Sequence, residues 1–306
     1  MILLDYHNLI IQETLKSRFS SEKVENIRMT VVDFDGVTYF IHTPESKTRI
    51  VLSMAMKCYK ELEQYGANDI LQREYGPYLI TPPEQGYNVT LEFNLENLPE
   101  DKDELIKKVS LLKRNVLAAP FERAFEQQRQ LEEQKDAPPN TEVMSIHYRD
   151  EEAIYIQAQA DRVTVIFSTL FKDETDRVFG KVFLQEFIDA RRRPAIQNAP
   201  QVLFANREPP LEIRHVGGLR DSDEVGYVTF VLFPRHFAQG QVREETISRI
   251  QIFRDYLHYH IKCSKAYMHS RMRMRVAEFL KVINRAKPEN AQAEKKLASG
   301  RAFRRP

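Results

Sequence analysis

The sequence predicts an α+β protein with two tandem similar domains, each an antiparallel β-sheet with flanking helices, ending in one very long C-terminal helix. Three observations lead to this fold class. Two regions alternate apolar and polar residues, each region is followed by residues with helical periodicity, and residues 241–287 contain neither glycine nor proline. Period-two patterns followed by helical patterns are typical of sheets that are covered by helices.

The first half of the chain begins with an amphipathic helix. Residues 26–56 then alternate as antiparallel strands, with a hairpin turn at Asp35-Gly36. The next predicted elements are a helix over 59–75, a strand over 86–93 and a long helix over 101–134. Pro120 lies inside that long helix, where its ring predicts a kink or the start of a second helical segment.

The second half repeats this order of elements. Alternating strands over 142–171 precede a helix over 173–193, an extended segment over 201–204, a strand over 226–233 and the final helix. This repetition indicates two domains related by internal duplication, with a linker at Lys135–Pro139; the alternative is that two α+β halves look alike by chance. The predicted division is 1–136 for the first domain, 137–240 for the second, 241–287 for the long helix and 288–306 for a basic tail.

The final helix carries an apolar stripe with a step of about 3.7 residues, which is helical periodicity. At ~1.5 Å per residue the helix is roughly 65 Å long, whereas a domain of ~150 residues has a radius of gyration near ~15 Å. The helix is therefore too long to bury its whole stripe on its own domain. The far end of the stripe, from Met272 to Ile283, predicts a partner helix laid alongside.

The formal charge of +1 conceals an uneven distribution. Residues 241–306 hold 16 basic and 6 acidic residues, whereas residues 1–240 hold 29 basic and 38 acidic. The basic excess indicates either a solvated helix face or contact with an acidic partner, such as nucleic acid, a membrane surface or an acidic protein.

The composition excludes other classes of protein. A hydrophobic content of 42% with 29% charged residues is typical of a globular chain. The two cysteines cannot form a disulfide framework, which favours the reducing cytosol. No apolar run approaches the ~18 residues of a membrane span, and the N-terminus lacks the basic stretch of a signal peptide.

Two short motifs suggest enzymatic or metal chemistry. Asp33-Phe34-Asp35-Gly36 has the form of the nucleophile loop of haloacid-dehalogenase-like phosphatases, but a strand follows at once, so a hairpin turn is favoured. Among His258, His260 and Cys263, only the last two share a helix face, and two ligands are too few for zinc. We therefore predict no catalytic, cofactor-binding or metal-binding residue, and no enzyme.

Five long segments of the chain carry a more specific signal. They are DFDGVTYFIHTP, DRVTVIFSTLFKDETDRVFGKVFLQEF, APQVLFANREPPLE, GYVTFVLFPRHF and RDYLHYHIKCSKAYMHSRMRMRVAEFLKVINRAKP. These segments resemble the p34-Arc family, which is subunit 2 of the actin-related protein 2/3 complex, from Met1 to Pro288. Departures from the family's pattern occur in three loops, in the C-terminal tail and at Pro120.

The resemblance implies a structural subunit of a seven-subunit complex that nucleates branched actin, in the cytoplasm and at cortical actin structures of the cytoskeleton. It implies no cofactor, pairing with a long helix of the complex's subunit 4, and contact with the side of an actin filament. The expected helix-pairing residues are Leu257, Ile261, Met268, Met272, Val276, Phe279 and Ile283. The expected filament contacts are Phe253, Arg254, Arg271, Lys281 and Arg285. The alternative is a basic scaffold that binds nucleic acid through phosphates.

Overall fold

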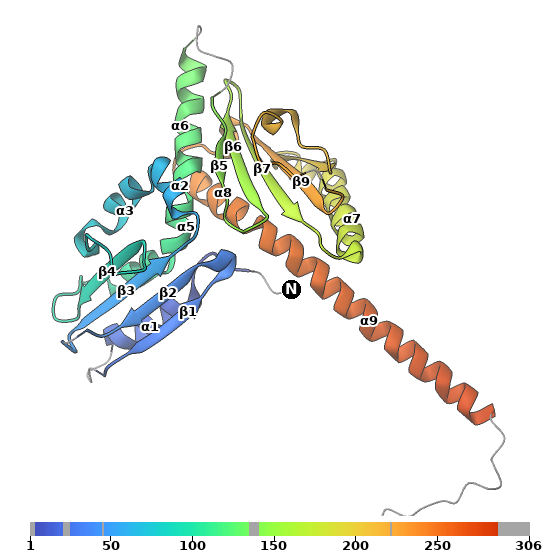
Figure 1. Cartoon of the computed structure of the whole chain (residues 1–306), viewed down its shortest axis with the longest axis horizontal. Coiled ribbons are helices and arrows are strands. Elements are labelled where there is room, and N and C mark those ends of the chain that lie inside the picture. Colours follow the sequence, from blue (N-terminus) through green and yellow to red (C-terminus); the bar gives the residue numbers. More distant parts are fainter. Residues whose placement is uncertain (1–3, 21–24, 45, 135–140, 221, 287–306) are drawn as a thin grey trace, which may run out of the picture. The chain divides into compact units, whose positions relative to one another are not determined.

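The computed structural model describes residues 4–20, 25–44, 46–134, 141–220 and 222–286. It confirms the predicted α+β class, with a four-stranded and a five-stranded antiparallel sheet (Figure 1). Contacts divide the chain into two compact units, Met1–Tyr259 and His260–Pro306, and both sheets belong to the first unit. The domain boundaries at 136, 240 and 287 stay predictions, and both the predicted linker and the basic tail lie outside the described residues.

The first sheet follows the order of its strands along the chain. It consists of β1 (Arg28–Val32), β2 (Thr38–His42), β3 (Arg49–Ala55) and β4 (Val89–Asn94). Val32 pairs with Thr38 across the first turn, and Asp35 and Gly36 adopt left-handed φ angles of 65° and 69°. The predicted hairpin is therefore confirmed, and the antiparallel pairing differs from the parallel sheet that a phosphatase loop requires.

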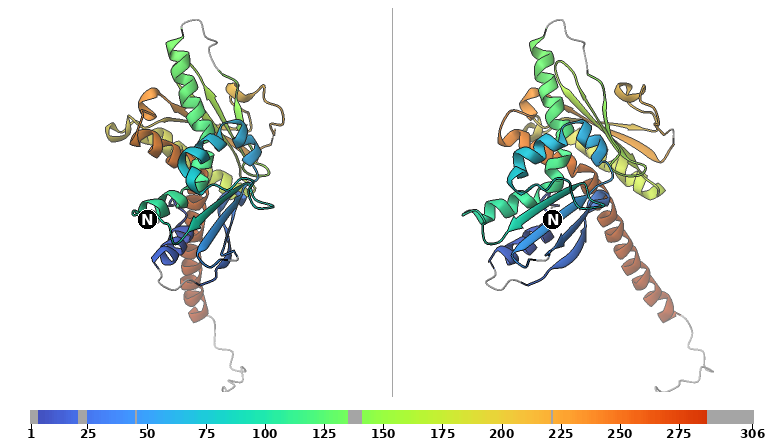
Figure 2. Two further views of the ribbon diagram at one scale, coloured as in Figure 1. Left: turned by 90° about the vertical axis from the view of Figure 1, so that its left-hand side faces the viewer. Right: turned by 60° about the vertical axis from the view of Figure 1, so that its left-hand side comes forward.

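Helices α1 (Leu9–Ser20) and α4 (Lys102–Ser110) pack against each other beside the first sheet (Figure 2). Helices α2 (Tyr59–Gln64) and α3 (Ala67–Tyr75) follow β3 in the chain, and α2 also contacts β5. The predicted N-terminal helix is confirmed in α1, which buries Ile11, Leu15 and Phe19 and places the Phe19 ring 5.8 Å from that of Phe93. Asp101 caps α4 by accepting a hydrogen bond from the Glu104 backbone N–H.

The long helix expected over 101–134 is in fact three helices. After α4 come α5 (Leu112–Leu117) and α6 (Ala119–Glu133). Pro120 is in the first turn of α6, where no intrahelical partner is needed for a backbone N–H, so the predicted break is confirmed. A further break at Leu111 was not predicted, because the sequence contains no glycine or proline there.

The second sheet has the strand order β5-β6-β7-β9-β8. Its strands are β5 (Met144–Ile146), β6 (Ala153–Ala158), β7 (Val163–Leu170), β8 (Gln201–Asn206) and β9 (Val225–Leu232). Every residue of β7 and β9 is buried, so both faces of the sheet centre are covered. Ile213, Val216 and Leu219 pack on one face, and α6 lies alongside β6 and β7.

Helix α7 (Glu174–Ala190) packs beside β8. Asp173 caps this helix by accepting a hydrogen bond from the Thr175 backbone N–H, and Glu174 and Asp176 lie in its first turn. The described residues also form five short 3₁₀ helices. They are η1 (Phe34–Gly36), η2 (Gly76–Tyr78), η3 (Pro194–Ile196), η4 (Leu211–Ile213) and η5 (Pro234–His236).

The C-terminal part of the described chain is helical, as predicted, but contains one interruption. Helix α8 (Gln241–Gln251) is separated by Ile252 from α9 (Phe253–Ala286), which is 34 residues long. The expectation of a single helix from 241 to 287 is therefore wrong at this residue, and Lys287 lies outside the described part. None of the described helices is both long and apolar enough to cross a membrane.

Candidate protein interface

Helix α9 forms without glycine or proline over its whole length, which leaves its backbone hydrogen bonds uninterrupted. With a rise of ~1.5 Å per residue, its 34 residues span about 50 Å. Its first seven residues belong to the unit that contains both sheets, and residues from His260 onward form the second unit. The two parts of the helix are therefore described separately.

The residues expected to pair with a partner helix differ in burial. Leu257 and Ile261 are buried. The other five are exposed apolar side chains on the second unit: Met268, Met272, Val276, Phe279 and Ile283. Phe279 and Met272 are 63% and 60% exposed. A helix turns by ~100° per residue, so these five side chains share an arc of about 80°.

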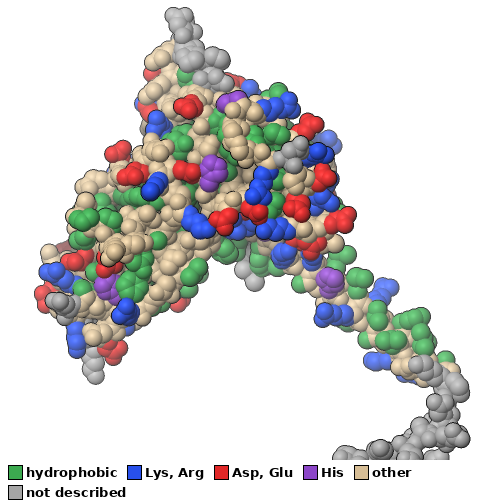
Figure 3. All heavy atoms as spheres, viewed as in Figure 1, with side chains coloured by type: hydrophobic (Ala, Val, Ile, Leu, Met, Phe, Trp, Pro, Cys, Tyr) green, Lys and Arg blue, Asp and Glu red, His purple; other side chains and the backbone are tan. Residues whose placement is uncertain are grey.

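Sequence reasoning missed four further exposed apolar residues on the same unit. They are Tyr267, Met274, Leu280 and Val282. Met274 is 62% exposed and lies about 160° from the centre of the five-residue stripe. In the sequence, Met274 follows Met272 by two residues, and this spacing places the two side chains on opposite sides of a helix. Figure 3 shows apolar side chains along this part of α9, interspersed with basic ones.

Exposed apolar side chains of this number indicate an interaction surface. Burying a Leu, Met, Phe, Val or Ile side chain contributes ~1.5–3 kcal/mol, so a helix that leaves several in water gains by covering them. Large exposed apolar patches on soluble proteins commonly mark interaction sites. The second unit therefore has the surface chemistry of a helix that binds another protein.

Basic residues on the second unit are distributed around the helix, and three of them lie away from the apolar stripe. Residues 260–286 contain seven Lys and Arg residues but one acid, Glu278. Relative to the centre of the apolar stripe, Arg271, Arg285 and Lys281 lie at about 100°, 140° and 180°, whereas Lys265 and Arg275 lie at about 20° and 60°. Arg271 donates a hydrogen bond of 2.6 Å to the Tyr267 hydroxyl. We call the part of the helix surface that carries Arg271, Lys281 and Arg285 its cationic side, and the exposed apolar residues Tyr267 and Met274 lie there too.

Phe253 and Arg254, two of the expected filament contacts, are engaged inside the first unit. The Phe253 ring packs 4.7 Å from Phe230 and 5.5 Å from Phe167, edge to face with the first of them. Arg254 is 15% exposed and forms an ion pair of 2.8 Å with Glu152. Their side chains hold the first turn of α9 against the second sheet.

Arg254 is part of a set of charged residues that we call the junction cluster. Its members are Asp35, Lys113, Arg149, Glu152, Arg254 and Asp255. Burial, followed by the charge of Asp35, raises the pKa of Asp255 from 3.8 to about 6, although Arg149 and Lys113 oppose the shift. Sequence reasoning had assigned Asp35 to a turn and did not find the cluster.

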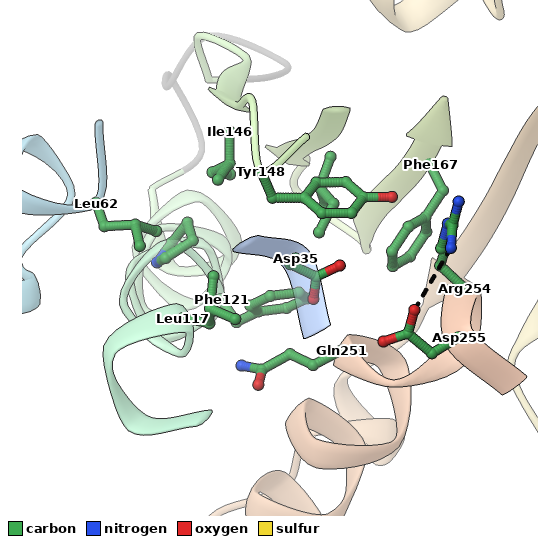
Figure 4. Close-up of a pocket in the computed structure, with 12 residues that line it drawn as sticks. Asp35, Leu62, Leu117, Phe121, Ile146, Tyr148, Phe167, Gln251, Arg254 and Asp255 are labelled. Atoms are coloured by element: carbon green, nitrogen blue, oxygen red, sulfur yellow. Dashed lines mark ion pairs between the residues drawn. The ribbon is translucent and has the colours of Figure 1, made fainter. Parts of the chain in front are cut away.

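A small cavity adjoins the junction cluster (Figure 4). Asp35, Arg254 and Asp255 line it together with apolar residues such as Phe121 and Phe167. Its volume of about 20 Å³ admits a single water molecule and no organic substrate. Within the described residues, no three His, Cys, Asp or Glu side chains converge to hold a metal ion. Of the surfaces described here, the two sides of α9 are the ones suited to binding another macromolecule.

Comparison with known proteins gives a consistent result. The family model described as "Arp2/3 complex, 34 kD subunit p34-Arc" matches residues 52–290. The chain is 56% identical over 317 residues to "Actin-related protein 2/3 complex subunit 2" of Schizosaccharomyces pombe, covering 99% of both chains. It is 42% identical over 306 residues to the protein of the same name from Dictyostelium discoideum, again covering 99% of both.

Proposed function

The chain belongs to the p34-Arc family of Arp2/3 complex subunits, and on this premise we propose that it scaffolds that complex by pairing α9 with a long helix of subunit 4. It is a structural, non-enzymatic subunit associated with the cytoplasmic actin cytoskeleton. We place it at cortical structures, where branched actin filaments are nucleated.

The observation that carries the pairing proposal is the exposed stripe Met268, Met272, Val276, Phe279 and Ile283. Its steps of four, four, three and four residues match the spacing with which helices interdigitate side by side. Methionine is well suited to such a surface, because its flexible side chain fills irregular gaps. Covering these five side chains, which are 37–63% exposed, contributes roughly 1–3 kcal/mol each, which is enough to support a stable pair.

The stripe offers a closely matched test of this pairing. Met272 and Met274 are the same residue type and are almost equally exposed, but two residues along a helix face about 200° apart. In the co-expressed complex, Met272→Asp should prevent purification of subunit 4 with the tagged chain, whereas Met274→Asp should leave it intact. Full recovery of subunit 4 with Met272→Asp would refute the pairing surface.

We also propose that the cationic side of α9 contacts the side of an actin filament. Arg271, Lys281 and Arg285 support this, because an acidic filament would be attracted to a side of the helix that is free when the apolar stripe is covered. Phe253 and Arg254 also remain predicted filament contacts, although both side chains pack against the second sheet and its loops. Filament co-sedimentation of the complex tests the proposal.

A further inference from the structure

We propose that Arg149 is a positioning residue that ties the first turn of α9 to both β-sheets. The inference rests on the proposed function in one respect, since α9 is the helix that we propose binds subunit 4. It concerns contacts within the first unit only, and it can be tested whether or not subunit 4 is the partner.

Arg149 lies in the turn between β5 and β6 and contacts carboxylates from three elements. Its Nη2 is 2.7 Å from Asp35 Oδ1, in the β1–β2 hairpin of the first sheet. The same nitrogen is 3.0 Å from Asp255 Oδ1, in the first turn of α9. Its Nε is 2.8 Å from Asp35 Oδ1 and 3.5 Å from Glu152 Oε2. One guanidinium therefore connects the first sheet, the second sheet and α9.

The chemistry of arginine explains why this position suits it. A guanidinium is planar, stays charged and presents five donors in a fixed fork, so it can serve several carboxylates at once. A lysine has a single nitrogen and would keep the charge without this geometry. Burial raises the cost of leaving any of these carboxylates without a cation, because the surroundings screen charge poorly.

The rest of the junction cluster balances the charges around Arg149. Lys113 lies 3.1 Å from Asp35, and Arg254 lies 3.6 Å from Asp255 as well as 2.8 Å from Glu152. Three cations thus face three carboxylates. Removing the Arg149 charge leaves Asp35 and Asp255 as like charges that share the two remaining cations with Glu152, which favours separation of the hairpin from the first turn of α9.

A second ion pair across the two sheets provides a control. Lys57, which follows β3 closely, is 2.7 Å from Asp150, which neighbours Arg149. These side chains are 61% and 81% exposed, so solvent screens the pair and its contribution is small. If bridging the two sheets with any ion pair were sufficient, Lys57 and Arg149 would be equivalent. They differ because the ion pairs of Arg149 are more buried than that of Lys57, and because Arg149 also contacts Asp255.

Hydrogen exchange of the assembled complex, followed by mass spectrometry, tests the inference. Arg149→Gln should accelerate amide exchange about tenfold in two separate segments together, residues 33–37 and residues 253–257. Lys57→Gln should leave both segments unchanged. Arg149→Lys should fall between the wild type and Arg149→Gln, since it restores the charge but not the fork.

Two results would overturn the inference. One is unchanged exchange in both segments with Arg149→Gln, and the other is an equal rise in β9, which would indicate general destabilisation. If Arg149→Gln fails to fold, Asp35→Asn supplies the test, because it should accelerate exchange in residues 253–257 although it alters a different element. Normal exchange there would refute the coupling. If the proposed pairing with subunit 4 is wrong, the co-purification experiment will show it, whereas amide exchange in these two segments will be unaffected.

Discussion

Phe279→Ala should weaken binding of the proposed partner helix by about two orders of magnitude. The Phe279 ring is 63% exposed in the chain. A phenylalanine side chain buries roughly 200 Å² when fully enclosed, so covering the exposed part removes about 125 Å² from water. At ~25 cal/mol per Å² this contributes ~3 kcal/mol, which corresponds to a change of about 150-fold in Kd.

The assay is a titration of purified subunit 4 against the full chain carrying each substitution, with thermal unfolding of each variant measured in parallel. The Tm of the chain alone should not change, because the ring is exposed. Met274→Ala is the control, since its side chain is equally exposed but lies on the other side of the helix. A change of about threefold or less for Phe279→Ala, or an equal loss for Met274→Ala, would show that the stripe is not the pairing surface.

Three further outcomes are expected. The pKa of Asp255 is raised from 3.8 to about 6, so between these pH values the folded state binds more protons than the unfolded state. The free energy of unfolding should therefore fall by up to about 3 kcal/mol as the pH rises from about 4 to about 6. Urea unfolding should lose this slope in Asp255→Asn; an unchanged slope would assign it to another group. Charge reversal of Lys281 and Arg285 together should reduce filament co-sedimentation about tenfold at low salt and less at high salt, and equal binding at both salt concentrations would argue against the cationic side. Arg254→Glu places an acid beside Glu152 and should destabilise the chain by ~3–5 kcal/mol in thermal unfolding; an unaltered Tm would contradict the buried ion pair.

Local signals in the sequence predicted most of the secondary structure correctly. The Asp35-Gly36 turn depends on the left-handed φ angles of two adjacent residues. The break before Pro120 depends on one missing donor. Each of these effects acts within about one helical turn, so the residues that cause it are adjacent in the sequence.

The interruptions at Leu111 and Ile252 could not be predicted in this way. Neither position has a glycine or a proline, so no local rule ends a helix there. Ile252 separates α8 from the turn of α9 that packs Phe253 among the aromatic rings of the second sheet. Packing with residues distant in the sequence overrode the helical preference of the segment.

The sequence by itself determined the α+β class, the hairpin, the long α9 and the apolar stripe, because periodicity and turn chemistry are local. Only the tertiary structure decided which residues of the stripe are buried and which are exposed. Leu257 and Phe279 obey the same helical spacing, but the first is buried and the second is exposed, since burial depends on what lies opposite. Likewise Asp35 and Arg149 meet across 114 positions of the chain, a separation at which no local pattern records a contact.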